Sequence, residues 1–533
     1  MHPAWHIDDV RDLIFESLDK ADLISIAATS RALFEVAINK LWNTLDSFDG
    51  LICCLPPDFL ERQLEREDIR RLDLYTSRVL RIRLGVGSLV ELLPSRFMKA
   101  KKDMNDKMDK RTRKNLKADK SLNDKQGRKL WSKLWRDIAE LRPSSHLFCN
   151  LQSVHVNNIV EPLILPLVGI SGLHLREISI KQVVENQDPS LIRGFLDGLQ
   201  DTPKLEYLAV RDGESGTLPA KIIRGAPLRH LRLDLPRNHK NYLRRPLKDR
   251  SILYHLLQKS TIEHLTVALD DTWLTREIRD LGDQNLPTLK TLWLNLTEFE
   301  FNWQNADQNP AAFFKLLAEP SLTVLDIKFP RYINGNMLIE LMSEVNRHCQ
   351  LRDLTELSFT CCNANIAGGG YPPSISPSEL TTALRTLLPL QRLKHLRISV
   401  APNFLDALDL ELDDSLAEYL PALESLRLDY SAFTGYAAYV SPRSFEGLSV
   451  RKLAAFCQIF PTLTEVRIGS VAQDWRLKET RNLCHEVICT SVKSFRVIDM
   501  PSSWDVFFHE QLRKSVQRYF PESDQAKRNA PFD

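Results

Sequence analysis

Hydrophobic residues recur along this chain as a six-residue pattern, Leu-x-x-Leu-x-Leu, in which the last two apolar positions are two residues apart. The pattern is clearest at residues 205–210, 289–294 and 423–428. Side chains two residues apart lie on the same face of a β-strand, so each copy predicts a short strand with one apolar face. One such strand cannot bury that face alone, but stacked copies can. Twelve copies, complete or looser, begin at Leu151, Leu175, Leu205, Leu228, Ile262, Leu289, Leu322, Leu354, Leu393, Leu423, Leu463 and Val492.

The segments between these copies predict helices, because their apolar residues recur at three- and four-residue steps. The clearest are residues 191–199, 252–257, 313–317 and 338–345. Prolines one or two residues ahead of a copy end the preceding helix and favour an extended entry to the strand. They are Pro203, Pro227, Pro287, Pro320, Pro421 and Pro461. The pattern predicts an α/β fold in which parallel strands line the inside of an open horseshoe and helices lie outside, as in leucine-rich repeat proteins.

The N-terminal residues follow a different pattern and predict a compact helical module. One short apolar helix covers residues 10–18, and Asp22 is the expected cap of a second helix over residues 23–28. Ser30 opens a third helix that reaches Trp42. Three short helices bury too little area for a comfortable core, so some of their apolar residues would stay exposed. Such a patch indicates a partner protein.

Residues 3–46 resemble an F-box of the style found in fungal, especially basidiomycete, proteins. The residues that carry the resemblance are Pro3, Trp5, Ile7, Val10, Leu13, Ile14, Phe15, Leu18, Asp22 and Leu23, followed by Ser30-Arg31-Ala32-Leu33-Phe34-Glu35, Ala37, Leu41 and Trp42. The resemblance implies a docking module for the Skp1 adaptor of a cullin-RING ubiquitin ligase, with an unknown protein substrate held by the repeats. It implies that the adaptor is contacted by Pro3, Ile7, Val10, Ile14, Leu18, Leu23, Ile26, Leu33 and Trp42. The alternative is a leucine-rich-repeat scaffold without a ligase role, whose N-terminal helices only cap the solenoid.

The expected domain organisation places the helical module at residues 1–48 and a linker helix with an irregular first repeat at 49–98. In that first repeat, Val79, Ile82 and Leu84 fit the six-residue pattern roughly. The repeats then occupy residues 134–504, with a glycine- and proline-rich loop expected at 368–374. A closing amphipathic helix and a loose tail are expected over residues 505–533.

Residues 99–133 interrupt this organisation with fourteen Lys and Arg against five Asp. The segment has almost no large apolar residue before Leu130 and Trp131, so it predicts a solvated, disordered or frayed insertion. A plain charged loop is the favoured interpretation, with nuclear import or phosphate contacts as alternatives. A protein that binds nucleic acid through this insertion is a weaker alternative, since no aromatic residues interleave its basic ones for base stacking. After it, a helix is expected from Leu130 to Leu141, with both tryptophans in the core.

Composition and motifs indicate neither a catalytic site nor a membrane-spanning segment. The net charge is +2, which predicts no general attraction to nucleic acid. The nine cysteines show no Cys-x-x-Cys spacing, which favours reduced core thiols and a cytoplasmic or nuclear protein without metal or cofactor. No apolar run approaches the roughly 20 residues that span a bilayer. No catalytic motif is present, and His485 with Cys484 or Cys489 lacks a third group, so we expect a non-enzymatic binding protein.

The residue between the last two apolar positions of each copy is expected to point out of the inner face of the strands. Among these residues are Trp293 and, in the last four copies, Arg397, Arg427, Arg467 and Arg496. Adjacent strands lie about 4.8 Å apart, so the four arginines predict a column of like charge. Arginine forks suit carboxylates and phosphates, so these five residues are the candidate substrate-binding set, for an acidic or phosphorylated target. The alternative is that Asp429, Glu465 and Glu424 neutralise the column internally.

Overall fold

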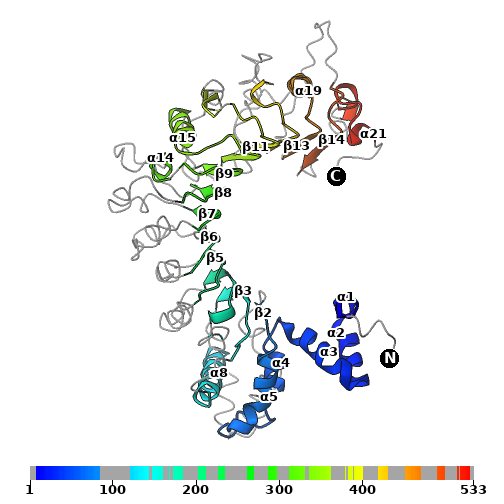
Figure 1. The fold of residues 1–533 in the computed structure, drawn as a ribbon, viewed down its shortest axis with the longest axis vertical. Coiled ribbons are helices and arrows are strands. Elements are labelled where there is room, and N and C mark those ends of the chain that lie inside the picture. Colours follow the sequence, from blue (N-terminus) through cyan, green and yellow to red (C-terminus); the bar gives the residue numbers. More distant parts are fainter. Residues whose placement is uncertain are drawn as a thin grey trace. The chain divides into compact units, whose positions relative to one another are not determined.

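The molecule is described from a computed structural model as two units, residues 1–256 and 257–533, which are taken separately below (Figure 1). The structure describes residues 8–84, 102, 120–142, 147–159, 167, 172–183, 202–211, 226–234, 261–268, 286–296, 311–317, 319–329, 335–361, 379, 382–383, 385–387, 389–399, 418–429, 450–469, 489–498, 513–514 and 516–527. The predicted helices at 191–199 and 252–257, the glycine-rich loop at 368–374 and all but Lys102 of residues 99–119 lie outside these ranges.

The first unit begins with the three predicted helices, α1 (Asp8–Ser17), α2 (Lys20–Thr29) and α3 (Arg31–Asn43). They enclose a small core of their own, made of Phe15, Leu23, Leu33 and Ala37. The predicted cap of the second helix was wrong by three residues. Asp19 is the N-cap, and its carboxylate accepts a hydrogen bond from the backbone N–H of Asp22 at 2.8 Å.

Helix α3 leads directly into a strand that the sequence pattern did not predict, β1 (Thr44–Leu45). This strand pairs in parallel with β2 (Arg81–Leu84), the irregular first repeat. Three further contacts hold α3 in place. The backbone N–H of Leu80 donates to the carbonyl of Asn43 at 3.0 Å, Arg78 forms an ion pair with Glu35 at 2.8 Å, and Trp42 stacks on Tyr75 with 4.5 Å between ring centroids. The helical module is therefore joined to the edge of the strand ladder by a short, paired connection.

From β1 the strands of the first unit form a parallel ladder in chain order. The remaining members are β3 (Ser153–Ile159), β4 (Glu177–Val183), β5 (Tyr207–Arg211) and β6 (His230–Asp234). Short helical segments also belong to this unit: α4 (Asp49–Cys53), α5 (Arg66–Thr76) and η3 (Gly172–His174).

Helix α8 (Lys120–Glu140) begins ten residues before the start expected at Leu130. Residues 120–133, the last part of the basic insertion, therefore belong to this helix. Its apolar side chains explain the difference, because Trp131 and Trp135 are buried and pack against each other at 5.5 Å and against Phe48 at 6.3 and 5.9 Å. The prediction that both tryptophans are core residues is confirmed.

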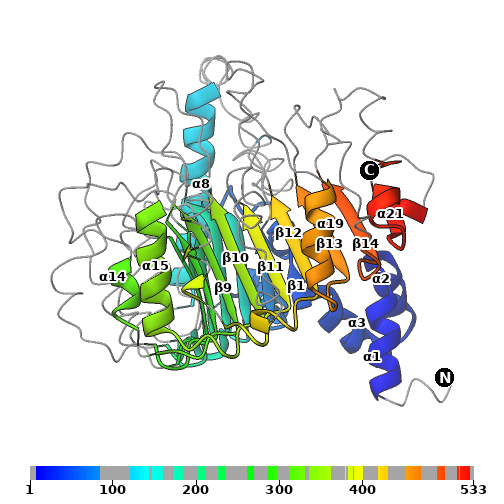
Figure 2. The same cartoon turned by 90° about the horizontal axis from the view of Figure 1, so that it is seen from above.

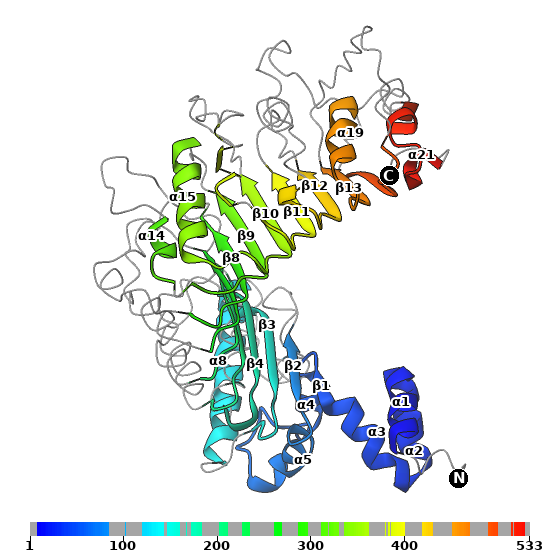
Figure 3. The same cartoon turned by 45° about the horizontal axis from the view of Figure 1, so that its top comes forward.

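The strands of the second unit are also paired in parallel and in chain order. Its strands are β7 (His264–Ala268), β8 (Thr291–Asn295), β9 (Val324–Phe329), β10 (Glu356–Cys361), β11 (His395–Ser399), β12 (Ser425–Asp429), β13 (Glu465–Gly469) and β14 (Ser494–Ile498). Its described helices are α14 (Ala311–Phe314), α15 (Gly335–His348), α19 (Val450–Ile459) and α21 (Asp524–Lys527). Figure 3 shows α14, α15 and α19 on one side of these strands. Across both units, all twelve predicted strands are confirmed, and the α/β class with leucine-rich-repeat-like parallel strands is correct.

Two features repeat from strand to strand and fix the register. First, the apolar positions of the copies are buried wherever their side chains are described, as in Leu423, Leu426 and Leu428, which are at most 2% exposed. Second, the carbonyl of the residue just before a strand accepts hydrogen bonds from two consecutive backbone N–H groups at the start of the following strand. The carbonyl of Lys394 accepts from Glu424 and Ser425, both at 2.9 Å.

Described residues near the C-terminus pack against β14, the last strand. Val516 and Phe520 are buried, and Phe520 packs on Phe495 of β14 with 4.9 Å between ring centroids. Asp524 then accepts a hydrogen bond from the backbone N–H of Phe495 at 3.0 Å, while its own N–H donates to Lys493 at 2.8 Å. These contacts satisfy part of the edge of β14, which would otherwise offer backbone groups for pairing.

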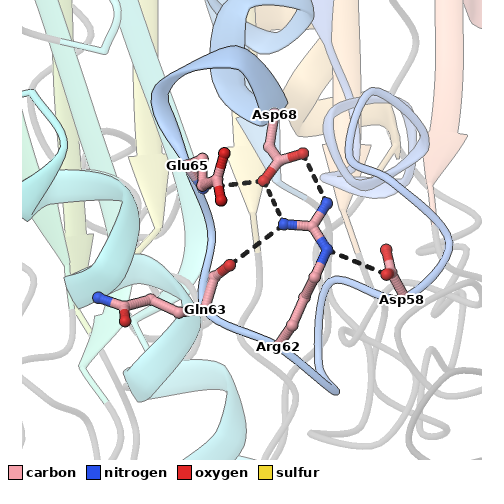
Figure 4. Close-up of polar contacts among 5 residues, drawn as sticks. All are labelled: Asp58, Arg62, Gln63, Glu65 and Asp68. Carbon is pink, nitrogen blue, oxygen red and sulfur yellow. Dashed lines mark hydrogen bonds and ion pairs between the residues drawn. The ribbon is translucent and has the colours of Figure 1, made fainter.

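A charged cluster stabilises the turn that leads into α5 (Figure 4). Arg62 donates two hydrogen bonds to Asp68, at 2.6 and 2.7 Å, one to Asp58 at 3.0 Å, and one to the carbonyl of Gln63 at 3.1 Å. Asp68 also accepts the backbone N–H of Glu65 at 2.8 Å, which closes a capping box at the helix N-terminus. The hydrogen bonds from Arg62 and Glu65 lower the pKa of Asp68 to about 2.

This lowered pKa predicts a pH-dependent contribution of Asp68 to stability. The carboxylate stabilises the fold above its unfolded-state pKa of about 3.9, and the contribution is lost as the pH falls toward about 2. We expect Asp68→Asn to lower the free energy of unfolding at pH 7, and the difference from wild type to shrink between about pH 4 and pH 2. Denaturant unfolding at several pH values measures this. Glu67→Gln, an exposed position in the same helical turn, serves as the control, and a difference independent of pH would contradict the prediction.

Candidate interaction surfaces

The strands of the second unit present one face toward the described helices and an opposite face, here called the open face. Along each strand, the side chains of the open face alternate with the buried leucines. Because neighbouring strands are paired in register, equivalent open-face positions lie side by side. The central row of this face is Thr266, Trp293, Asp326, Ser358, Arg397, Arg427, Arg467 and Arg496. The predicted alignment of these positions is therefore present in the structure. Figure 2 shows β9 to β14, the adjacent strands that carry most of it.

The four arginines of this row, here called the arginine row, occupy directly paired positions on β11, β12, β13 and β14. Arg397, Arg427 and Arg467 are half-buried and Arg496 is exposed. Neighbouring strands lie about 4.8 Å apart. This spacing is shorter than the Debye length of about 8 Å at physiological salt, so dissolved ions screen adjacent charges only in part. The row therefore places four cationic side chains on adjacent strands.

The structure shows which of the nearby carboxylates pair with this row. Glu465 does, because Arg467 donates to its Oε1 from Nε at 2.7 Å and from Nη2 at 2.6 Å. Ser425 donates to the other oxygen of Glu465 at 3.0 Å. Partial burial opposes ionisation of Glu465, but the hydrogen bonds from Arg467 and Ser425 outweigh it and lower its pKa. Glu424 does not join the row, since it pairs with Lys394 at 2.8 Å, which lowers the pKa of Glu424.

The other half of the open face has a different character. Trp293 of β8 is 42% exposed, a large aromatic surface for a position next to buried leucines. Beside it in the row, Asp326 of β9 is partly desolvated. Burial raises the pKa of Asp326, although Ser358, Lys328 and Arg397 oppose the rise. Strands β7 to β10 contain no arginine, so the open face changes from mixed and slightly acidic to basic between β10 and β11.

The first unit has a corresponding row without a concentration of charge. Arg83, His155, Ser179, Ala209 and Arg232 are paired in register on β2 to β6. Its two arginines are separated by three intervening strands. The structure brings together four of the five candidate substrate-binding residues, Arg397, Arg427, Arg467 and Arg496, and places Trp293 on the same face three strands before Arg397.

The N-terminal module uses several of the predicted adaptor contacts internally. Leu23 and Leu33 lie in its core, and Leu18 and Ile26 pack against that core. Trp42 is occupied by its stacking on Tyr75. Val10 and Ile14 are half-buried, and Pro3 and Ile7 lie outside the described residues.

Three apolar side chains that the sequence analysis did not assign to the adaptor are exposed instead. Leu13 on α1 is 67% exposed, Ile24 on α2 is 59% exposed and Phe34 on α3 is 36% exposed. A signal for Ile24 was present in the sequence, because Leu23 and Ile24 are adjacent and a helix cannot bury both on one face. The module therefore presents at least one large apolar residue to solvent from each helix.

Of the cysteines and the histidine that could be combined into a catalytic pair, Cys489 alone lies within the described residues. Cys489 is buried, hydrogen bonds from Cys457 and Ser491 lower its pKa to about 6, and His485 lies outside the described residues. Over the described ranges, no group of three His, Cys, Asp or Glu residues could hold a metal ion. Within those same ranges, no helix is long and apolar enough to span a membrane.

Comparisons with known proteins add little to this geometry. No model of a protein family matches the chain, and no curated protein matches it. Among solved structures, a leucine-rich repeat protein of Leptospira interrogans is 13% identical over 73% of this chain and 85% of that one, with a TM-score of 0.27.

The alternation of buried and open-face residues predicts opposite responses at neighbouring positions of β12. Leu426→Ala removes a fully buried side chain and is expected to lower the free energy of unfolding by about 2–5 kcal/mol. Arg427→Ala, one residue later, is expected to cost less than about 1 kcal/mol, the size of a surface ion pair. Denaturant unfolding of both variants measures the difference. Equal losses would contradict the assignment of Arg427 to the open face.

Proposed function

We propose that this chain is the substrate receptor of an SCF-type (Skp1–cullin–F-box) ubiquitin ligase, acting in the cytoplasm or nucleus. The N-terminal helices would bind a Skp1-like adaptor and, through it, a cullin. The strand ladder would hold a target protein. The chain would bring two proteins together and perform no bond chemistry itself.

The observation that carries this proposal is the organisation of the N-terminal module. It has a core of its own, yet it leaves Leu13, Ile24 and Phe34 at least 36% exposed. Exposed apolar side chains on a small helical module favour burial against a partner protein. The resemblance of residues 3–46 to an F-box implies that this partner is a Skp1-like adaptor, and we propose the exposed residues together with Val10 and Ile14 as its contacts.

The attachment of the module also fits a receptor. Helix α3 continues into β1, and the Arg78–Glu35 and Trp42–Tyr75 contacts brace it against the beginning of the ladder. A short, braced connection would hold an adaptor at a defined position relative to the first strands. This matters for a receptor because ubiquitin transfer depends on how the target is presented.

The second candidate function is a repeat scaffold whose N-terminal helices serve only as a solenoid cap. The same α3–β1 connection favours it, because β1 covers the exposed edge of β2. A cap has no need of exposed Leu13 and Ile24, whereas an adaptor-binding module does. The two functions therefore differ in what these side chains do.

The experiment is capture of the full chain by a purified Skp1-like adaptor. Wild type is expected to bind, and Leu13→Asp with Ile24→Asp is expected to weaken binding by about tenfold or more, since each change buries a charge without a partner at the interface. Both positions are exposed, so the thermal unfolding midpoint should stay close to that of wild type. Leu74→Asp, at a 50% exposed position on α5, is the matched control and should bind normally. Failure of wild type to bind the adaptor would favour the scaffold.

A further inference from the structure

Two buried cysteines of the second unit lie against each other beside its last strands. Cys457 belongs to α19 and Cys489 to the segment just before β14, and their thiols share a hydrogen bond. We propose that this pair is an oxidation site, at which hydrogen peroxide converts the two thiols into a disulfide. The inference is independent of adaptor binding, because it concerns the C-terminal strands alone.

The first step is the surroundings of the Cys489 sulfur, on which several donors converge. They are the thiol of Cys457, the hydroxyl of Ser491 at 3.3 Å, and the backbone N–H groups of Ser491 and Val492. Hydrogen bonds to an acceptor favour its charged form. Here they outweigh burial and lower the pKa of Cys489 to about 6. Cys489 is therefore mostly thiolate at neutral pH, and the thiolate is the nucleophilic form of cysteine.

The second step is the opposite character of Cys457. Its side chain is completely buried. Burial raises the pKa of Cys457, and the hydrogen bond to Cys489 and the charge of that sulfur raise it further. One sulfur of the pair is thus a thiolate and the other a thiol that donates to it. A nucleophilic cysteine beside a second cysteine is the arrangement in which a sulfenic acid is converted to a disulfide.

The chemistry takes two reactions. In the first, the Cys489 thiolate attacks one oxygen of hydrogen peroxide. A sulfur–oxygen bond forms, the oxygen–oxygen bond breaks and hydroxide leaves, so the sulfur is oxidised to a sulfenic acid and the peroxide is reduced. In the second, the sulfur of Cys457 attacks the sulfur of Cys489. The disulfide forms, the sulfur–oxygen bond breaks, and the departing hydroxyl takes the thiol proton of Cys457 and leaves as water.

The third step is access to the pair. Both side chains are buried, but Thr490, the neighbour of Cys489, is exposed. The reactive sulfur therefore lies just below the surface of the second unit. Hydrogen peroxide is small, so a local opening of the segment before β14 is enough to admit it.

The disulfide would add a covalent link where the elements are joined by non-covalent contacts. Helix α19 precedes β13, whereas Cys489 precedes β14, so the bond would span β13. The backbone N–H of Cys489 also donates to the carbonyl of Tyr519 at 2.8 Å, which connects the same segment to the C-terminal residues. Oxidation would therefore tie α19 to the entry of the last strand and restrict the unfolded chain between them.

The experiment treats the full chain with hydrogen peroxide and then blocks the remaining thiols with N-ethylmaleimide under denaturing conditions. Mass spectrometry of proteolytic peptides measures the Cys457–Cys489 cross-link and the free thiol left at each cysteine. Cys349 is the matched control, because it is also buried in the second unit but burial raises its pKa to about 12. A parallel sample contains dimedone, which traps sulfenic acids. The variants are Cys457→Ser and Cys349→Ser.

We expect Cys489 to lose its free thiol at least about tenfold faster than Cys349, because the thiolate is the form that reacts. The cross-linked peptide should appear in the same period and disappear with dithiothreitol. Cys457→Ser should abolish the cross-link and raise dimedone labelling of Cys489 by about threefold or more, since its sulfenic acid then has no second thiol to react with. Cys349→Ser should leave the cross-link unchanged.

Three results would overturn the proposal. They are the absence of the cross-linked peptide from wild type, equal oxidation rates of Cys489 and Cys349, and dimedone labelling of Cys489 that Cys457→Ser leaves unchanged. The first two are measured on the wild-type chain, so the proposal stays testable if substitution of buried Cys457 impairs folding.

Discussion

The structure depends on one repeated backbone interaction between neighbouring strands. The carbonyl of the residue just before one strand accepts hydrogen bonds from two consecutive N–H groups at the start of the following strand. It recurs at β3 to β6 and at β8 to β14, from the carbonyl of Leu80, which binds Gln152 and Ser153, to that of Thr464, which binds Lys493 and Ser494. This contact fixes the register of neighbouring strands, because a shift by one residue would exchange buried and exposed side chains. The buried apolar side chains of the copies, such as Leu423, Leu426 and Leu428, then add the free energy of burial. Register and burial thus reinforce each other in every strand.

A ladder built in this way has consequences at its ends and on its open face. In the first unit, β1 and helix α3 cover the edge of β2, and in the second unit Asp524 and Phe520 pack on β14. On the open face, identical positions of successive copies become neighbours, so a repeated arginine in the sequence becomes a row of charge. The same register that buries Leu426 therefore places Arg427 between Arg397 and Arg467.

Most of the ladder could be predicted from the sequence because its signal is local and repeated. A six-residue pattern with an expected helix and a proline in phase specifies a strand, and all twelve strands begin two residues after the first apolar position of their copies. Three features could not be predicted. Strand β1 is two residues long and is recognised by its pairing with β2. Helix α8 starts among lysines and is supported by the packing of Trp131 and Trp135 on Phe48, which is far away in the sequence. The role of Asp524 depends on its hydrogen bond with β14. Each depends on contacts between residues far apart in the sequence.

The candidate sites show the same division. The arginine row follows from the repeat, but the choice of Glu465 rather than Glu424 as its counter-ion depends on side-chain contacts that the pattern does not contain. In the helical module, the sequence located the apolar residues but assigned Leu23 and Leu33 to a partner, whereas the three-helix packing buries them and exposes Leu13 and Ile24. Burial within a small module is decided by how its helices pack, which periodicity alone leaves open.

The central claim is that the exposed apolar side chains of α1, α2 and α3 form a docking surface for an adaptor protein. The most direct test is hydrogen–deuterium exchange of the full chain with and without a purified Skp1-like adaptor. We expect the adaptor to slow exchange within α1–α3 while leaving exchange in the described strands unchanged. Unchanged exchange in α1–α3 at adaptor concentrations that saturate other F-box proteins would contradict the claim.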